Sequence, residues 1–240
     1  MKYILLVILV AIIADVAFEA ARFYHHVRVS AGLVAKAIPY QRADGSLSML
    51  VIGDSTAVGV GADTPADTVA GYLSNTLNAS VENYSKSGAV TADMEAQFAQ
   101  AKNSHYDLIL IQVGANDVIR FHSLSGTQAL LDTILKNART KSDHVVLLTA
   151  GRIGEAPLFP WFVGPFITHR AHQMRDLFKA TADANGVAYV DLFNIPDPFL
   201  SDPQKYYAPD GLHLTKDGWY FWYEQTLQTI EATWPGFVHA

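Results

Sequence analysis

The sequence contains no cysteine, and only 17% of its 240 residues are charged. Because thiols are missing, disulfides, thiol catalysis and cysteine-bound metals are excluded, while either redox compartment is compatible with the chain. The net charge is −6 and no basic stripe is present, which argues against a nucleic-acid partner because phosphate binding needs clustered lysine and arginine. Half of the residues are hydrophobic, so the chain has enough apolar side chains for a substantial core.

Charged residues are also scarce at the N-terminus, where twelve uninterrupted apolar residues run from Tyr3 to Ala14 before Asp15 and Glu19 follow. A membrane span needs about 20 apolar residues, whereas the core of a secretory signal needs about 7–15. The stretches around Asp15 and Glu19 fit the small-x-small pattern of a signal cleavage site poorly. The segment is therefore an uncleaved anchor, a cleaved signal or a buried helix, and we expect membrane association through it.

The chain divides into two parts at about residue 38. Residues 1–38 are expected to form a hydrophobic anchor or signal helix followed by a helical linker that ends before Pro39. Residues 39–240 are expected to form one further domain. The thinly spread basic residues after the apolar run favour a cytoplasmic body, but Lys2 precedes the run, so the side of the membrane stays open.

The second part alternates apolar strands with helical periods. Apolar residues recur at helical spacing at Val69, Leu73 and Leu77, and similar stripes run through residues 130–135, 167–181 and 219–230. This alternation predicts an α/β fold in which a parallel sheet is covered by helices on both faces. The expected strands are Met49–Gly53, Val81–Tyr84, Leu108–Val113, Val145–Thr149 and Val187–Asp191.

Residues suited to acyl transfer follow four of these five strands. Ser55 follows the first strand in "GDST", Gly88 follows the second in "SKSGA", Asn116 follows the third in "GAND", and Asp210 and His213 follow the fifth in "DGLH". Ligands of parallel sheets bind beyond the carboxyl ends of the strands. A serine nucleophile needs a base and a group that orients the base, which His213 and Asp210 supply. The backbone N–H groups of Ser55 and Gly88 and the side-chain amide of Asn116 are the candidate oxyanion donors.

Each motif alone has a simpler interpretation as a helix cap or a turn, and other chemistries fit less well. Gly59 and Gly61 begin a dinucleotide fingerprint, but Thr64 stands where a third glycine is needed. His169 and His172 lie one helical turn apart without the acid that would complete a known metal motif. We therefore expect neither a metal nor a cofactor.

Together the four motifs, over residues 48–232, resemble the four blocks of the SGNH, or GDSL-type, hydrolase family. The resemblance implies a three-layer α/β/α sandwich with a five-stranded, flavodoxin-like parallel sheet, and ester hydrolysis without metal or cofactor. It also implies that Ser55 is the nucleophile, that Asp210 and His213 complete the triad, and that Gly88 and Asn116 belong to the oxyanion hole. The missing second glycine of a Gly-x-Ser-x-Gly elbow argues against an ordinary α/β-hydrolase.

A long apolar loop over residues 151–166 follows the fourth strand. It is either a lid packed on the sheet or a wall for an acyl chain, which makes Leu158, Phe159, Trp161 and Phe162 candidate substrate-binding residues. With an apolar N-terminal segment on the same chain, the favoured hypothesis is a membrane-associated esterase of acyl or lipid-like esters, similar to the lysophospholipase-like or thioesterase-like members of the family. The alternatives are a deacetylase of carbohydrate or cell-envelope esters and a non-catalytic, membrane-tethered binding module.

Overall fold

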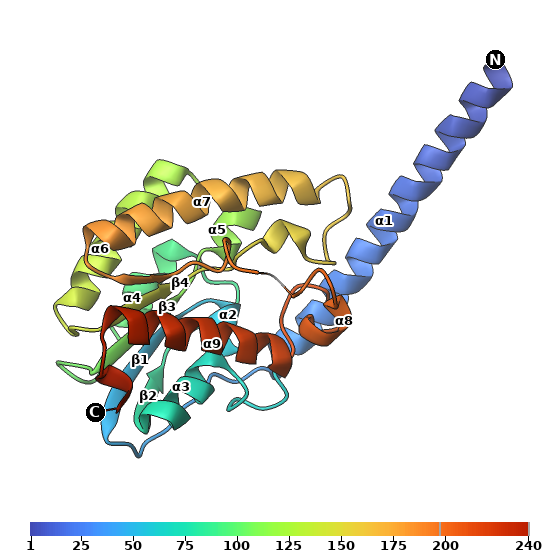
Figure 1. Cartoon of the computed structure of the whole chain (residues 1–240). Coiled ribbons are helices and arrows are strands. Elements are labelled where there is room, and N and C mark those ends of the chain that lie inside the picture. Colours follow the sequence, from blue (N-terminus) through green and yellow to red (C-terminus); the bar gives the residue numbers. More distant parts are fainter. Residues whose placement is uncertain (197, 240) are drawn as a thin grey trace.

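The computed structural model describes residues 1–196 and 198–239, and its centre is a parallel sheet of five strands in the order β2-β1-β3-β4-β5 (Figure 1). This is the flavodoxin-like order, in which the chain reverses its direction of winding between β1 and β3. The predicted fold class is thus confirmed. The strands are β1 Leu47–Gly53, β2 Ala79–Asn83, β3 Leu108–Gln112, β4 Val145–Leu148 and β5 Ala188–Val190.

All five strands lie where the sequence predicts them, and only their ends differ. β1 begins two residues before the predicted Met49, because Leu47 and Ser48 still pair with Ala79 and Ser80 of β2. β5 is shorter than predicted by one residue at each end, because its pairing with β4 extends only from Ala188 to Val190. Neither shift alters which residues leave the sheet at its carboxyl edge.

Helices cover both faces of the sheet and bury two apolar clusters. α6 and α7 pack together on one face, and α3 and α9 pack together on the other (Figure 1). The predicted helical stripes lie within these four helices. The helices and 3-10 turns after α1 are α2 Ser55–Val58, α3 Val69–Leu77, η1 Thr91–Asp93, α4 Met94–Phe98, α5 Ala115–Ile119, α6 Leu124–Arg139, η2 Ile153–Glu155, α7 Gly164–Ala184, α8 Pro203–Tyr206, α9 Lys216–Thr233 and η3 Phe237–His239.

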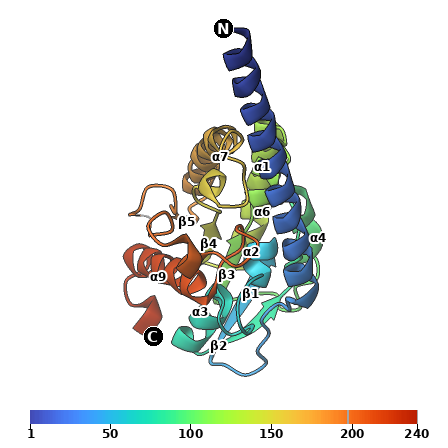
Figure 2. The same ribbon diagram turned by 90° about the vertical axis from the view of Figure 1, so that its right-hand side faces the viewer.

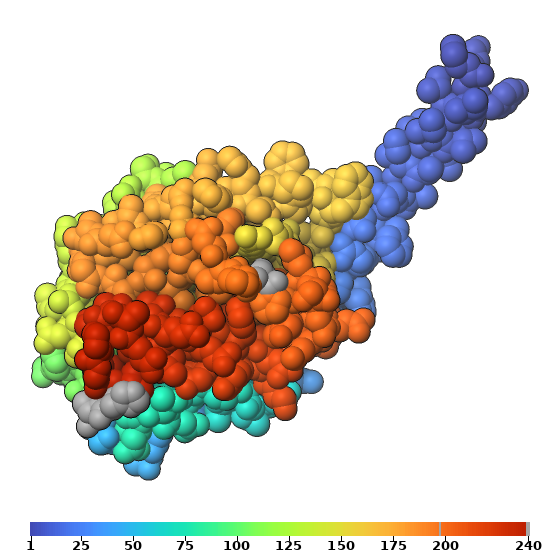
Figure 3. Space-filling view, in the orientation of Figure 1, coloured from blue at the N-terminus to red at the C-terminus, as the bar shows by residue number. Residues whose placement is uncertain are grey.

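The N-terminal helix α1, Lys2–Lys36, is one unbroken helix of 35 residues that projects from the body (Figures 1 and 3). It is long and apolar enough to cross a membrane. Residues 1–18 are exposed throughout, and half-buried residues begin at Glu19, so the second half of the helix lies against the body (Figure 2). No residue of α1 is fully buried, which speaks against the interpretation as a buried helix.

Candidate active site

Ser55 is the first residue of α2 and lies directly beyond the carboxyl end of β1. The turn before it is tight, because a Cβ at Gly53, whose φ is +156°, would lie 2.1 Å from the carbonyl oxygen of Gln112. The side chain of Gln97 holds the same turn from the other side. Its Oε1 accepts from the Gly53 N–H at 2.7 Å, and its Nε2 donates to the Gly53 carbonyl at 2.9 Å. The position of the serine is therefore fixed by buried backbone contacts.

Asp54 caps the N-terminus of α2 and is completely buried. Its Oδ1 accepts from the backbone N–H and from the hydroxyl of Thr56, both at 2.8 Å. Within the described part of the chain, its Oδ2 has no hydrogen-bond partner. Burial outweighs the two bonds from Thr56 and raises the pKa of Asp54 to about 6.

The structure brings Ser55, His213 and Asp210 together, although Ser55 and His213 are separated by 158 positions in the sequence. His213 Nε2 lies 3.0 Å from Ser55 Oγ, and His213 Nδ1 lies 2.6 Å from Asp210 Oδ2. Asp210 is fully buried and His213 is nearly so. The other oxygen of Asp210 accepts from the backbone N–H groups of Leu212 and His213. Burial alone would raise the pKa of Asp210, but these bonds and the contact with the His213 ring hold it below its ordinary value.

The three candidate oxyanion donors lie at the same edge. Among the described residues, the backbone N–H groups of Ser55 and Gly88 donate no hydrogen bond. Gly88 has a φ of +81°, a conformation that favours glycine and explains this residue type at the position. Asn116 Nδ2 donates to the carbonyl of Ala89 at 3.0 Å, which fixes the amide and uses only one of its two hydrogens. Ser55, Gly88 and Asn116 all line one cavity together with His213.

This cavity has a volume of about 230 Å³. Beyond Ser55 and His213, most of its wall is apolar or aromatic and comes from the loops that follow β4 and β5 and from α9. The polar lining side chains also include Thr56 and Arg152. A pocket whose wall is mainly apolar, with a smaller number of polar groups, suits a ligand with an apolar part and a reacting polar group. The apolar wall residues include Ala150, Ile153, Leu192, Ile195, Phe199, Leu212, Leu214, Phe221 and Trp222.

The four apolar loop residues predicted to bind substrate are not among those that line this cavity. Leu158 and Phe159 are buried in the core, and the Leu158 N–H donates to the Gly211 carbonyl at 2.8 Å. Trp161 and Phe162 point outward, with 68% and 37% of their surface exposed. The loop thus packs on the body, because its inner residues fill space beside the loop that carries His213.

His172, one of the two histidines considered as metal ligands, contacts other side chains instead. His172 Nδ1 lies 3.3 Å from Asp176, and the His172 ring packs against Phe193. Within residues 1–196 and 198–239, no group of three or more histidine, aspartate or glutamate side chains is arranged to hold a metal ion.

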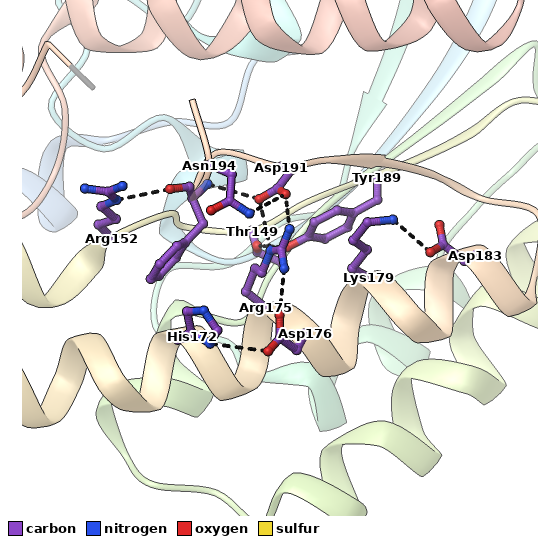
Figure 4. Close-up of polar contacts among 11 residues, drawn as sticks. Thr149, Arg152, His172, Arg175, Asp176, Lys179, Asp183, Tyr189, Asp191 and Asn194 are labelled. Atoms are coloured by element: carbon purple, nitrogen blue, oxygen red, sulfur yellow. Dashed lines mark hydrogen bonds and ion pairs between the residues drawn. The ribbon is translucent and has the colours of Figure 1, made fainter. Parts of the chain in front are cut away.

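A polar network fixes the pocket wall that follows β5 (Figure 4). Arg175 of α7 forms an ion pair with Asp191, the residue after β5, and its Nε donates to the same carboxylate at 3.2 Å. Arg152 Nε donates to the carbonyl of Phe193 at 3.0 Å. Leu192, which lies between these two anchored residues, is a cavity residue. The network therefore supports the apolar wall rather than the reacting groups.

Some residues that shape the site were not identified from the sequence. Gln97 clamps Gly53, and the buried Asp117 accepts from the N–H and the hydroxyl of Thr91, both at 3.0 Å. Asp117 was visible in the "GAND" motif, but Gln97 lies in a short helix with no motif of its own. Only its long-range contact with β1 distinguishes Gln97 from any other polar residue.

Residues 51–219 match the GDSL-like lipase/acylhydrolase family, and the chain therefore belongs to this family. The resemblance stated from the four motifs is confirmed. No curated protein matches the chain in sequence.

The fold is also found in solved structures of low sequence identity. A catalytic mutant of Axe2, an acetylxylan esterase from Geobacillus stearothermophilus, superposes with a TM-score of 0.62 at 18% identity, covering 79% of this chain and 96% of that chain. TesA superposes with a TM-score of 0.59 at 22% identity, covering 78% of this chain and 99% of that chain. LAE5, an α/β hydrolase from the metagenome of Lake Arreo in Spain, gives a TM-score of 0.60 at 18% identity, over 80% of this chain and 96% of that one. At these identities the similarity establishes the fold.

Proposed function

We propose that this protein is a serine ester hydrolase that works through an acyl-enzyme, with Ser55 as nucleophile, His213 as general base and Asp210 as the group that orients the base. The observation that carries the proposal is the continuous contact from Ser55 Oγ to His213 Nε2 at 3.0 Å and from His213 Nδ1 to Asp210 at 2.6 Å. Membership in an acylhydrolase family supplies the reaction class.

In the first half of the reaction, Ser55 Oγ attacks the ester carbonyl carbon while His213 Nε2 accepts the hydroxyl proton. The carbonyl oxygen becomes an oxyanion, which the N–H groups of Ser55 and Gly88 and the amide of Asn116 stabilise. When the ester C–O bond breaks, His213 returns the proton to the leaving alcohol, and Ser55 carries the acyl group. In the second half, water attacks the acyl carbon with His213 again as base, which releases the acid and restores the serine.

The apolar cavity favours an acyl or lipid-like ester over a small polar one. An acyl chain bound beyond Ser55 is in contact with side chains such as Phe199 and Trp222, which remove its surface from water. The apolar half of α1 supports membrane association of the enzyme. Trp161 Nε1 donates to Asp15 at 3.1 Å, at the point where α1 leaves the body, and exposed tryptophan is typical of a membrane–water boundary.

A second candidate is a deacetylase of carbohydrate or cell-envelope esters. It is favoured by the similarity in fold to Axe2, which is an acetylxylan esterase. The two candidates share the reacting residues and differ only in the acyl group. A series of nitrophenyl esters separates them: kcat/KM that rises from acetyl to octanoyl supports the acyl esterase, whereas strict preference for acetyl supports the deacetylase.

The hydrolase proposal is tested with full-length protein in detergent micelles. A fluorophosphonate probe should label the wild type on Ser55, as shown by mapping of the modified peptide, and should not label Ser55→Ala. The matched control is Ser125→Ala, which removes an exposed serine and should leave labelling and turnover intact. If the wild type neither reacts with the probe nor cleaves any ester, the protein is a non-catalytic binding module and the proposal is wrong.

A further inference from the structure

Helix α1 ends at Lys36, whereas the family match begins at residue 51, so the helix lies outside the matched domain. Its second half nevertheless contacts the body along one face. Half-buried residues recur there every three or four positions, a spacing that places them on a single face of a helix. They are Glu19, Arg22, His26, Val29, Ser30, Leu33 and Val34.

Contacts of two side chains, Arg22 and His26, join this face to the loops beside the catalytic histidine. The guanidinium group of Arg22 donates to the carbonyls of Pro157 and Phe159. His26 Nδ1 lies 3.2 Å from the carbonyl oxygen of Pro209, the residue immediately before Asp210. The helix is therefore held against the loop that supplies two of the three proposed triad residues.

The last turns of the docked half reach the cavity itself. Ser30 and Val34 line the same cavity as Ser55 and Asn116. They lie four positions apart and thus on one face of the helix. The neighbouring residues Ala31 and Ala35 are exposed. Adjacent positions of α1 therefore differ in whether they face the cavity or the solvent. Figure 2 shows the lower part of α1 running next to α2, the helix that begins with Ser55.

We infer that the docked half of α1 is a wall of the substrate pocket and that Val34 helps to set the size of the acyl group that the pocket accepts. The inference rests on the proposed ester hydrolysis, and it gives α1 a role in specificity in addition to any role as an anchor. The substrate class is an ester with an acyl group longer than acetyl, part of which lies against Val34. A larger side chain at this position shortens the space for that group.

The test is a chain-length profile of two matched variants, Val34→Phe and Ala35→Phe, in full-length protein reconstituted in phospholipid vesicles. Both place the same side chain on adjacent residues of one helix, but only position 34 faces the cavity. kcat/KM is measured for nitrophenyl acetate, butyrate and octanoate. Val34→Phe should lower the octanoate-to-acetate ratio about tenfold or more, since small changes of fit in an apolar pocket are worth factors of this size. Ala35→Phe should keep the wild-type ratio.

Two results overturn the inference while the proposed function stands. One is an unchanged ratio in Val34→Phe, and the other is an equal fall of the ratio in both variants, which would indicate a general disturbance of α1. Val34→Ala provides a second measurement with little risk to folding, because it should raise the ratio by enlarging the pocket. A wild type that cleaves none of the three esters would instead refute the proposed function, and the inference with it.

Discussion

Replacement of Asp54 gives the sharpest physical prediction, because within the described part of the chain only one oxygen of its buried carboxylate accepts hydrogen bonds. Oδ1 is bonded to Thr56, whereas Oδ2 has no partner among the described residues. Asp54→Asn keeps an oxygen that accepts from Thr56 and removes the charge. The variant therefore separates the role of Asp54 as a helix cap from the cost of burying its ionised form.

The magnitude follows from the pKa of Asp54, which burial raises from 3.8 to about 6. Because the folded state holds the proton more tightly, the unfolded state loses its proton first as the pH rises. The stability that Asp54 contributes is fully present below the unfolded pKa and is lost as the pH rises through the folded pKa of about 6. A difference of about two pKa units corresponds to about 3 kcal/mol in the free energy of unfolding, roughly half of it lost between about pH 5 and pH 8.

The assay is urea unfolding of full-length protein in detergent micelles, followed by tryptophan fluorescence between pH 5 and pH 8. Asp54→Asn should gain about 1.5 kcal/mol relative to the wild type over this range, because only the wild type has this carboxyl to ionise. The matched control is Asp143→Asn, which removes an exposed carboxylate. A difference between wild type and Asp54→Asn that stays constant across the range would refute the reasoning on Asp54.

The remaining predictions concern turnover and the rigidity of the site. Ser55→Ala should lower kcat for nitrophenyl esters at least a thousandfold, because the proposed nucleophile is lost; turnover equal to the wild type would exclude this role. Asp210→Asn should lower kcat about 10⁴-fold with little change in KM, because the amide favours the wrong tautomer of His213; a change confined to KM would contradict the orienting role. Asn116→Ala should lower kcat about 10²-fold to 10³-fold if its amide binds the oxyanion, and a purely structural role would instead lower the urea midpoint. Gln97→Ala should lower the free energy of unfolding by about 2–4 kcal/mol, because two buried backbone groups of Gly53 lose their partners; an unchanged midpoint would show that water replaces the side chain.

The strands and the four motifs were predictable because they depend on local pattern. Most of the strands are short apolar runs, and Ser55, Gly88 and Asn116 lie within five residues of the ends of β1, β2 and β3. Parallel strands carry their carboxyl ends to one edge, so strand order in the sequence was enough to bring these residues together. His213 lies far beyond the end of β5, so its pairing with Ser55 was predicted from the "DGLH" motif and the family resemblance in addition to the topology.

The pocket wall could not be predicted in the same way. Trp161 and Phe162 looked like pocket residues because they are large and apolar, but their direction depends on how the loop folds back on Gly211. Val34, in contrast, belongs to a helix outside the family domain, and only its docking on the body brings it to Ser55. Tertiary packing decides which surface a side chain contacts, and the pattern of residues along the sequence carries little information about this choice.

Because α1 is one continuous helix, its length would fix the distance between the active site and a membrane that held the apolar half of α1. From Asp15, which accepts a hydrogen bond from Trp161, to Ser30 and Val34 at the cavity, a helix advances about 22–28 Å. Under the proposed membrane association, an ester still embedded among lipid tails would not reach Ser55, and a lipid would first have to be withdrawn from the bilayer. Withdrawing a lipid with one acyl chain into water costs much less free energy than withdrawing a lipid with two. Under the proposed membrane association, the length of α1 would select against intact two-chain lipids and in favour of single-chain or water-soluble esters.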